Sequence, residues 1–406
     1  MPHDTTLIAT LAVGLTAALI GGIVAARLRL PPLVGYLLAG VAVGPFTPGF
    51  VADAHLAPQL AEVGVILLMF GVGIHFSPVD LLSVRRLALP GAIGQVAAAT
   101  ILGIGLSHLW GWTVGEGLVF GLALSVASTV VLLRALEARG AVQAPDGRVA
   151  VGWLIVEDLV MVLALVLLPA LAEPLGGTAV DGSDRSLGVT LALTLGKVVI
   201  FGVLMLVAGV RIIPWLLGWI ERTGSRELFV LATLAAALGI AYGASELFGV
   251  SFALGAFLAG VVVNESEFSH RAAEEALPLR EAFAVLFFVS VGMLIDPSFL
   301  VDNLGRVLAV AAVIVVGKAI AAIVIVRALG GPSRTGLTVA AGLAQVGEFS
   351  FILAELGIGL NLLPPEGRDL ILAGALVSIT VNPLAWRLVD SLAASTRARS
   401  PAIART

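Results

Sequence analysis

The chain has 406 residues, of which 59% are hydrophobic and only 12% are charged. A soluble domain is about 45–50% apolar and about 25% charged, so this composition excludes a soluble globular protein. The net charge is −4 with no basic tract, which excludes nucleic-acid binding, and the absence of cysteine excludes disulfides, thiol chemistry and cysteine-ligated metals.

Apolar segments recur along the whole chain, separated by short polar connections. A helix of about 20 apolar residues crosses the hydrocarbon core of a bilayer, which is about 30 Å thick. We therefore predict an all-α polytopic membrane protein with about thirteen transmembrane helices. The first segment lacks a cationic start and a cleavage motif, so we interpret it as a membrane span and not as a signal peptide. The predicted segments are centred near residues 15, 38, 67, 98, 125, 160, 200, 236, 256, 287, 315, 344 and 380.

The basic residues predict the orientation of these helices. With the N-terminus outside, 18 of the 23 basic residues fall in inside loops or the C-terminal tail, and only Arg185, Arg306 and Arg368 fall outside. Cytoplasmic loops carry an excess of arginine and lysine, so this asymmetry favours an outside N-terminus and a cytoplasmic C-terminus. The remaining two, Lys197 and Lys318, are the only lysines, and both lie inside apolar segments.

The sequence contains an internal repeat. Segment 35–43 recurs as segment 255–263 with six of nine positions identical, at an offset of 220 residues. The copies lie in the second and ninth predicted helices, seven positions apart, and because seven is odd the two copies have opposite orientations. Inverted repeats with a binding site at their interface are typical of secondary transporters. The same offset, within one residue, links Val72-Gly73 with Val291-Gly292, Pro78 with Pro297, and Gly121-Leu122-Ala123 with Gly342-Leu343-Ala344.

Two corresponding segments, 121–138 and 342–359, mix small and polar residues into apolar runs. Glycine and hydroxyl side chains weaken a helix interior and can free backbone groups. Broken helices are tolerated at membrane depth only where protein or a water-filled cavity covers them. We therefore predict two discontinuous helices that cross at their breaks and present dipole ends and carbonyls to an ion. The polar centre is formed by Ser125, Ser128 and Thr129 in the first helix, and by Gln345, Gly347, Glu348 and Ser350 in the second.

Two adjacent carboxylates, Glu157 and Asp158, lie in the middle of the apolar run 151–165. A central aspartate costs about 2.5–3.5 kcal/mol on insertion scales, so an ionisable residue at this depth indicates function. Adjacent residues point about 100° apart on a helix, so one can face an ion path while the other faces a fixed partner. A structural ion pair is the competing interpretation.

Lys318 is the best partner for these carboxylates, since it is the only cation deep in the second repeat near the crossing helices. We predict a core salt bridge between Lys318 and Glu157. Lys197 lies between the repeats without an equivalent, which favours a structural role such as pairing with a helix end. Glu348 is as well suited to lining the cytoplasmic funnel as to binding an ion.

The sequence argues against metal binding, nucleotide binding and catalysis. The five histidines are scattered over loops and span ends without metal-ligand spacing, so we predict no metal beyond a transported monovalent cation. The Gly-x-Gly sequences do not follow a strand into a helix, which argues against nucleotide binding and predicts no cofactor. No constellation of nucleophile and base is visible, so an enzyme is disfavoured.

Seven motifs that follow one another along the chain have a recognisable combination of residues. They are stretches 32–40, 64–70, 127–136, 153–162, 264–267, 286–293 and 343–349. In this order they resemble the Kef-type potassium–proton antiporters of the monovalent cation:proton antiporter superfamily, most of all its YbaL-like branch. The resemblance covers essentially the whole chain.

The resemblance implies thirteen helices, a dimerisation domain and a mobile core that contains the crossing helices. It assigns the ion-binding aspartate to Asp158 and the core lysine to Lys318. The residue before that aspartate is Gln in typical Kef proteins and Asp in electrogenic sodium–proton relatives, whereas here it is Glu157. This departure leaves the choice of ion and the stoichiometry open.

The resemblance also implies a domain plan. We expect a transmembrane exchanger domain over residues 1–393 and a cytoplasmic tail over 394–406, with no regulatory nucleotide-binding domain. Kef-type proteins usually continue into such a domain, so either the chain is truncated or a regulatory subunit is separate or missing. The exchanger domain is expected to comprise a first repeat at about 6–172, a linking helix at about 187–212 and a second repeat at about 225–392.

The predicted function is exchange of K⁺, favoured over Na⁺, for H⁺ across the bacterial inner membrane by a homodimer in contact with lipid. Asp158 would bind a cation or a proton, with Glu157, Ser125, Ser128 and Thr129 completing the site. A Na⁺/H⁺ antiporter remains open as an alternative. A cation channel is the alternative of another class, against which the buried carboxylates and the inverted repeat argue.

Overall fold

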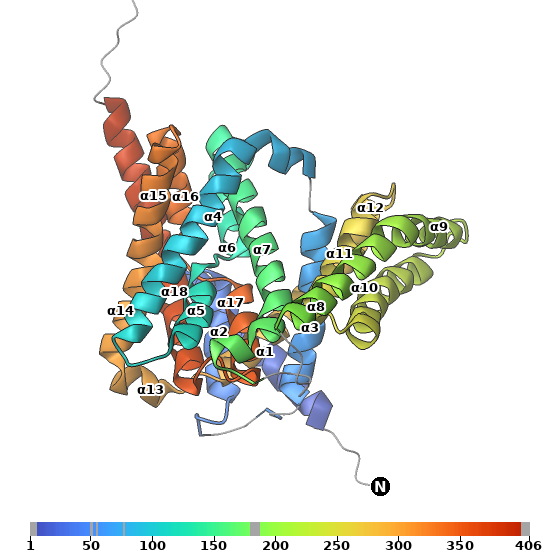
Figure 1. Cartoon of the computed structure of the whole chain (residues 1–406), viewed down its shortest axis with the longest axis horizontal. Helices are drawn as coiled ribbons and strands as arrows, with labels where there is room; N and C mark the ends of the chain where they lie inside the picture. Colours follow the sequence, from blue (N-terminus) through green and yellow to red (C-terminus); the bar gives the residue numbers. More distant parts are fainter. Residues whose placement is uncertain (1–5, 49–51, 54–55, 76–77, 179–186, 399–406) are drawn as a thin grey trace, which may run out of the picture. The chain divides into compact units, whose positions relative to one another are not determined.

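The computed structural model describes residues 6–48, 52–53, 56–75, 78–178 and 187–398, and all regular structure within them is helical (Figure 1). The predicted tail lies partly outside this range, as do Arg185 and the outermost N-terminal residues. The helices group into two compact units, each built from both halves of the sequence.

Unit 1 comprises residues 1–77, 162–174 and 178–297. It contains the end of α7 (Pro145–Leu171) and the predicted linking helix, which is longer than expected and runs without interruption to Glu221 through a π-helical turn. Its helices are α1 (Thr6–Arg27), α2 (Pro32–Val43), α3 (Leu56–Ile74), α8 (Leu187–Leu204), η2 (Met205–Gly209), α9 (Val210–Glu221), α10 (Arg226–Phe248), α11 (Phe252–Asn264) and α12 (Ser269–Met293).

Unit 2 comprises residues 78–161, 175–177 and 298–406. It contains the larger part of α7, a short helix η1 (Glu173–Leu175) at its margin, and both predicted discontinuous helices. Its other helices are α4 (Pro78–His108), α5 (Val114–Ser125), α6 (Thr129–Glu137), α13 (Pro297–Asp302), α14 (Leu304–Ala312), η3 (Val313–Gly317), α15 (Lys318–Ala328), α16 (Ser333–Leu343), α17 (Glu348–Gly359) and α18 (Pro365–Ala398).

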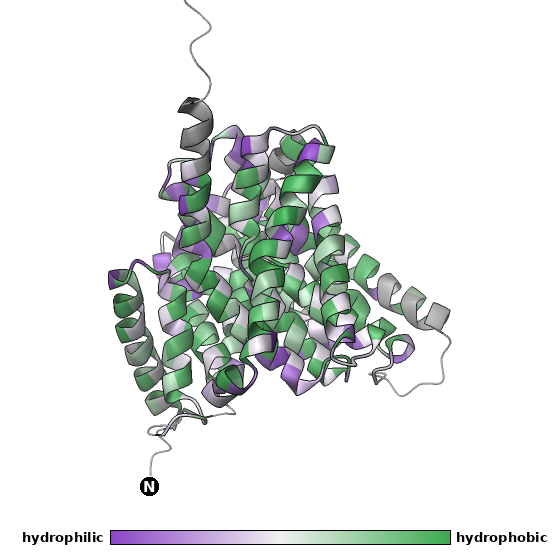
Figure 2. Ribbon diagram, turned by 90° about the vertical axis from the view of Figure 1, so that its left-hand side faces the viewer, coloured by the Kyte–Doolittle hydropathy of each residue, from purple (hydrophilic) through white to green (hydrophobic). Residues whose placement is uncertain are grey.

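The helices match the thirteen predicted segments. Nine helices in the described residues are long and apolar enough to span a membrane, and the pair α16–α17 forms one further span bent by 51°. The shorter apolar helices α2, α5 and α11 occupy the remaining three segments, with α6 continuing α5. Hydrophobic residues predominate along the helices (Figure 2). Together with the number of apolar spans, this makes the chain a multi-pass membrane protein.

The inverted repeat is visible as two equivalent helix crossings in unit 1. Where α2 crosses α12, a Cβ on Gly40 would lie 2.1 Å from the carbonyl oxygen of Val289, and one on Gly292 would lie 2.1 Å from that of Leu37. At so short a distance only glycine fits, and small residues are what allow membrane helices to approach closely.

Where α11 crosses α3, the repeat-related residues meet in the same way. A Cβ on Gly260 would lie 2.2 Å from the carbonyl oxygen of Phe70, and one on Gly73 would lie 2.2 Å from that of Phe257. Every residue in this crossing is offset by 219 or 220 positions from its counterpart in the first crossing. The predicted inverted repeat is therefore confirmed at the level of atoms.

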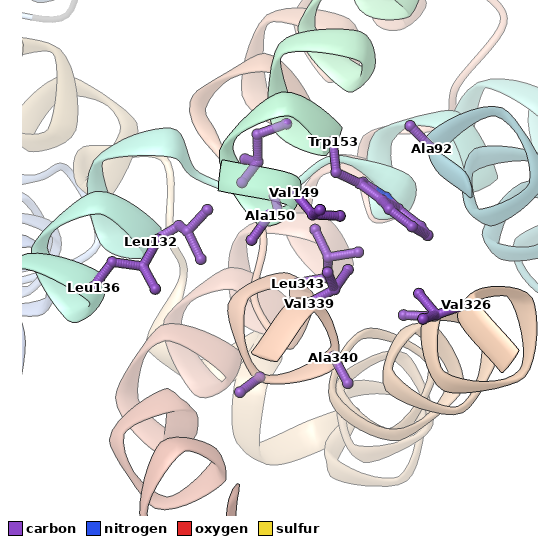
Figure 3. Packing of buried hydrophobic residues seen from close by; sticks show 14 of the residues in the cluster. Ala92, Leu132, Leu136, Val149, Ala150, Trp153, Val326, Val339, Ala340 and Leu343 are labelled. Atoms are coloured by element: carbon purple, nitrogen blue, oxygen red, sulfur yellow. The ribbon is translucent and has the colours of Figure 1, made fainter. Parts of the chain in front are cut away.

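The core of unit 2 surrounds the fully buried indole of Trp153, whose ring extends from α7 toward α4 and α15 (Figure 3). Trp153 also packs on α4 at Gly91, where an added Cβ would lie 2.1 Å from the ring. This packing fixes the part of α7 that carries Glu157 and Asp158. The apolar partners in the cluster include Ala92, Leu132, Leu136, Val149, Ala150, Val326, Val339, Ala340 and Leu343.

Replacing Gly292 by alanine should destabilise unit 1, because the new methyl group meets a backbone carbonyl that cannot rotate away. We expect a loss of about 1–3 kcal/mol, measured as a lower thermal midpoint in detergent. Gly239→Ala is the matched control, since no atom lies within 4 Å of its added Cβ. An unchanged midpoint for Gly292→Ala would contradict the close crossing.

Candidate functional site

The two discontinuous helices break where the sequence predicts. Helix α5 ends at Ser125 and α6 begins at Thr129, and the backbone between them is extended at Val126 and Ser128. The Ser128 hydroxyl caps α6 by accepting a hydrogen bond from the backbone N–H of Val131 at 3.4 Å. In the second helix α16 ends at Leu343 and α17 begins at Glu348.

The two breaks cross in direct contact. A Cβ on Gly347 would lie 2.7 Å from the carbonyl oxygen of Ala127, so glycine is required by the close approach of the two backbones. The Gln345 amide joins the breaks, since its Oε1 accepts from the Ser128 N–H at 3.0 Å and its Nε2 donates to the Ser128 carbonyl at 3.1 Å. The Ser350 hydroxyl adds a bond of 2.5 Å to the Ala123 carbonyl.

Lys318 is fully buried and bridges both breaks. Its Nζ donates to the carbonyls of Val126 and Gln345, each at 2.9 Å. These carbonyls follow the C-terminal ends of α5 and α16, where the helix dipoles concentrate negative potential. One ammonium group therefore stabilises the ends of both half-helices.

Glu157 is fully buried on the opposite side of the first break. Its Oε2 accepts from the backbone N–H of Ala127 at 3.1 Å. Lys318 is its nearest opposite charge and attracts it, but no nitrogen–oxygen contact of 4.0 Å or less joins them. The predicted direct salt bridge is thus replaced by a longer-range attraction between the two charges. The reason is that the ammonium group donates its hydrogen bonds to the carbonyls that the helix breaks leave free.

Asp158 differs from Glu157 in its exposure and in its hydrogen-bond partner. It is 5% exposed, and its Oδ2 accepts from the Thr129 hydroxyl at 3.2 Å, in the first turn of α6. Glu348, which is 4% exposed, begins α17 and faces both Asp158 and the Ser128 hydroxyl, while its Oε2 has no hydrogen-bond partner among the described residues. Carboxylates therefore lie at the N-terminal ends of α6 and α17, where the dipoles favour negative charge.

The structure brings nearly all the predicted site residues into this one region of unit 2. The exception is the Ser125 hydroxyl, which does not contact Asp158 but bonds within its own helix. The Ser125 hydroxyl is buried and donates to the Leu122 carbonyl of its own helix at 2.7 Å. The hydroxyl that reaches Asp158 belongs to Thr129.

Sequence reasoning missed two buried amide side chains that hold the broken helices. Gln95 on α4 donates to the Ser125 carbonyl at 3.1 Å, and Asn382 on α18 donates to the Ala341 carbonyl at 2.8 Å. Each is a single amide side chain in the apolar part of its helix, and that was the one available signal in the sequence.

Lys197 belongs to unit 1, whereas the residues of this region belong to unit 2. Its side chain is exposed, and its Nζ lies 3.7 Å from a Cβ built on Gly249, the residue that caps the C-terminal end of α10. A cation at a helix C-terminus is stabilised by the dipole, which agrees with the structural role predicted for this lysine.

No group of three or more histidine and acidic side chains is arranged as metal ligands within the described residues. The oxygens at the first break are one carboxylate with a hydroxyl beside it and a second carboxylate nearby. Hard cations and protons are the species that such oxygens bind.

Residues 14–388 match the family model described as sodium/hydrogen exchanger, transmembrane. The chain belongs to this family of transporters. The candidate cation/proton antiporter YbaL of Escherichia coli (strain K12) is 58% identical over 396 residues, which are 98% of this chain and 71% of YbaL.

A second relative and a solved structure agree with this assignment. K(+) efflux antiporter 4 of Arabidopsis thaliana is 33% identical over 392 residues, which are 96% of this chain and 65% of the plant protein. The structure of the sodium proton antiporter MjNhaP1 from Methanocaldococcus jannaschii superposes with a TM-score of 0.71 at 17% identity, over 95% of this chain and 98% of that one. The predicted sodium/proton-antiporter-like fold is therefore confirmed.

Replacing Lys318 by methionine should strongly destabilise unit 2, because two buried carbonyls lose their donor and Glu157 loses its nearest cation. We expect a loss of about 3 kcal/mol, measured as a lower thermal midpoint in detergent. Lys197→Met removes the only other lysine and should have little effect, since that side chain is exposed. Equal effects of the two substitutions would contradict the bridging role.

Proposed function

We propose that the chain exchanges a monovalent cation for protons across the bacterial inner membrane by alternating access, with K⁺ preferred to Na⁺. The observation that carries the proposal is the contrast between two neighbouring carboxylates. Asp158 is slightly exposed and accepts a hydrogen bond from a hydroxyl group. Glu157 is fully buried and accepts a hydrogen bond from a backbone N–H. A carboxylate of the first kind can release and rebind an ion, while one of the second kind stays fixed.

In this mechanism Asp158 binds either the cation or a proton. The Thr129 hydroxyl and Ser128 lie beside it, and Glu348 supplies negative potential from the second broken helix. The carbonyls of Ser125, Val126, Ser128 and Gln345 already accept hydrogen bonds from side chains, so they are poor cation ligands. The cation shell would consist of side-chain oxygens and water.

Glu157 and Lys318 serve the mechanism as a fixed pair. They hold opposite sides of the same break, Glu157 at the N–H of Ala127 and Lys318 at the carbonyl of Val126. Their charges cancel, so the charge on Asp158 is the one that changes when a proton replaces the cation. Burial of a net charge is costly, which favours states in which Asp158 is always neutralised by one or the other.

The preference for K⁺ rests on the relatives described as a cation/proton antiporter and a K(+) efflux antiporter. A Na⁺/H⁺ antiporter is the second candidate, favoured by the description of the family model.

We further propose a homodimer in contact with lipid, with an outside N-terminus and a cytoplasmic C-terminus. Regulation by a further subunit or domain is also part of the proposal.

Asp158→Asn should abolish exchange in proteoliposomes, because a neutral amide neither binds a proton nor attracts a cation. The measurement is the collapse of an imposed pH gradient on adding K⁺, repeated with Na⁺ to rank the two ions. Asp302→Asn is the control, since Asp302 is an exposed carboxylate on α13. An active Asp158→Asn variant would overturn the mechanism.

Competition at one carboxylate also predicts a pH dependence. A proton and a cation that exclude each other must weaken each other's binding by the same factor. The half-saturating K⁺ concentration should therefore rise as pH falls, approaching about tenfold per pH unit once Asp158 is mostly protonated. A half-saturating concentration that stays constant while only the maximal rate changes would argue against a shared site.

A further inference from the structure

Three of the buried polar atoms without a hydrogen-bond partner in the described residues belong to neighbouring side chains. They are Oε1 of Gln95, Nε1 of Trp153 and Oε1 of Glu157, and all three side chains are fully buried. An unpaired buried polar atom costs about 1–3 kcal/mol, so three in one place need a physical explanation.

The contacts of these residues bring them to one side of the first break. Gly91 of α4 packs on the ring of Trp153, and one helical turn further along each helix come Gln95 and Glu157. Gln95 and Glu157 also hold the same short stretch of backbone, Gln95 through the Ser125 carbonyl and Glu157 through the N–H two residues later. The Trp153 indole N–H is directed at the Glu157 carboxyl from the preceding turn of α7 and attracts it, although the two groups do not meet the geometry of a direct hydrogen bond.

The three unpaired atoms are complementary to one water molecule. The indole supplies a donor, and the amide and carboxylate oxygens supply two acceptors. A water would accept from Trp153 and donate to Gln95 and Glu157, and buried waters typically make about three such bonds to groups that otherwise lack partners.

We propose that Gln95, Trp153 and Glu157 bind a structural water behind the first break, on the side away from the Thr129–Asp158 hydrogen bond. The water completes the coordination of the Glu157 carboxylate, whose other oxygen is held by the backbone. Glu157 is then fixed by bonds to three elements, α4, the first break and its own helix. Gln95 and Trp153 are positioning residues, because they act on the exchange site through Glu157.

A double-mutant cycle on thermal stability tests the water site. Gln95→Leu and Trp153→Phe each remove one of its ligands, and each should lower the thermal midpoint by about 2 °C or more. Gln95→Leu also loses the direct bond from Gln95 to the Ser125 carbonyl. If both residues hold the same water, the double variant should therefore lose less stability than the sum of the two single losses. Additive losses would overturn the proposal, because independent sites add.

Trp386→Phe is the matched control for this cycle. Trp386 is also buried with an unpaired Nε1, but it lies on α18 under the guanidinium of Arg139. Its effect should add to that of Gln95→Leu. Coupling as strong as that of Trp153→Phe would show that the cycle reports general loosening of unit 2, and it would count against the shared water.

Exchange kinetics provide a readout that general loosening does not move. The kinetic expectation rests on the proposed exchange at Asp158, whereas the stability cycle does not. Gln95→Leu and Trp153→Phe should each raise the half-saturating K⁺ concentration by about three- to tenfold, and the double variant should show no further rise.

Should the variants fail to fold, the wild-type protein still decides the matter. A cryo-EM map that resolves ordered water should show density within hydrogen-bond distance of all three atoms. A direct contact between Gln95 and Glu157 with no density between them would overturn the proposal, even if Asp158 proves to be the exchange site.

Discussion

The buried ammonium of Lys318 is the interaction on which the site depends. Breaking a helix inside a membrane frees carbonyl groups that lipid cannot satisfy. Here two helices break where they cross, and one lysine donates to a freed carbonyl of each. The two breaks can remain in contact only while that ammonium, the Gln345 amide and the absence of a side chain at Gly347 are all in place.

The positions of the buried carboxylates are explained by the ends of the same half-helices. The C-terminal ends of the half-helices face a cation and the N-terminal ends face carboxylates, so each dipole meets a charge of opposite sign. Within this arrangement Glu157 and Asp158 have separate roles although they are adjacent in sequence. The helical turn between them directs Glu157 to the backbone at Ala127 and Asp158 to the Thr129 hydroxyl.

The sequence predicts much of this because charges and helix-breaking residues are rare in apolar segments. Glu157, Asp158 and Lys318 stand out there, and the repeat identifies both broken helices before any coordinates are considered. What it could not predict are the choices among hydrogen-bond partners. Lys318 bonds to carbonyls rather than to Glu157, because helix breaks create acceptors that no composition reveals. Ser125 turns to its own helix, since a hydroxyl can always bond to the preceding turn. Gln95 and Asn382 escaped notice because a single amide in a membrane helix is ordinary until its carbonyl partner is known.

The most direct test of the account is the position of the bound cation. Thallous ion is a close substitute for K⁺ and scatters X-rays anomalously. In crystals grown at high pH with Tl⁺, the account predicts one anomalous peak beside the Asp158 carboxylate and the Thr129 hydroxyl, with Lys318 still bonded to both breaks. A peak at Glu157, or one at the carbonyls of Val126 and Gln345 with Lys318 displaced, would contradict it.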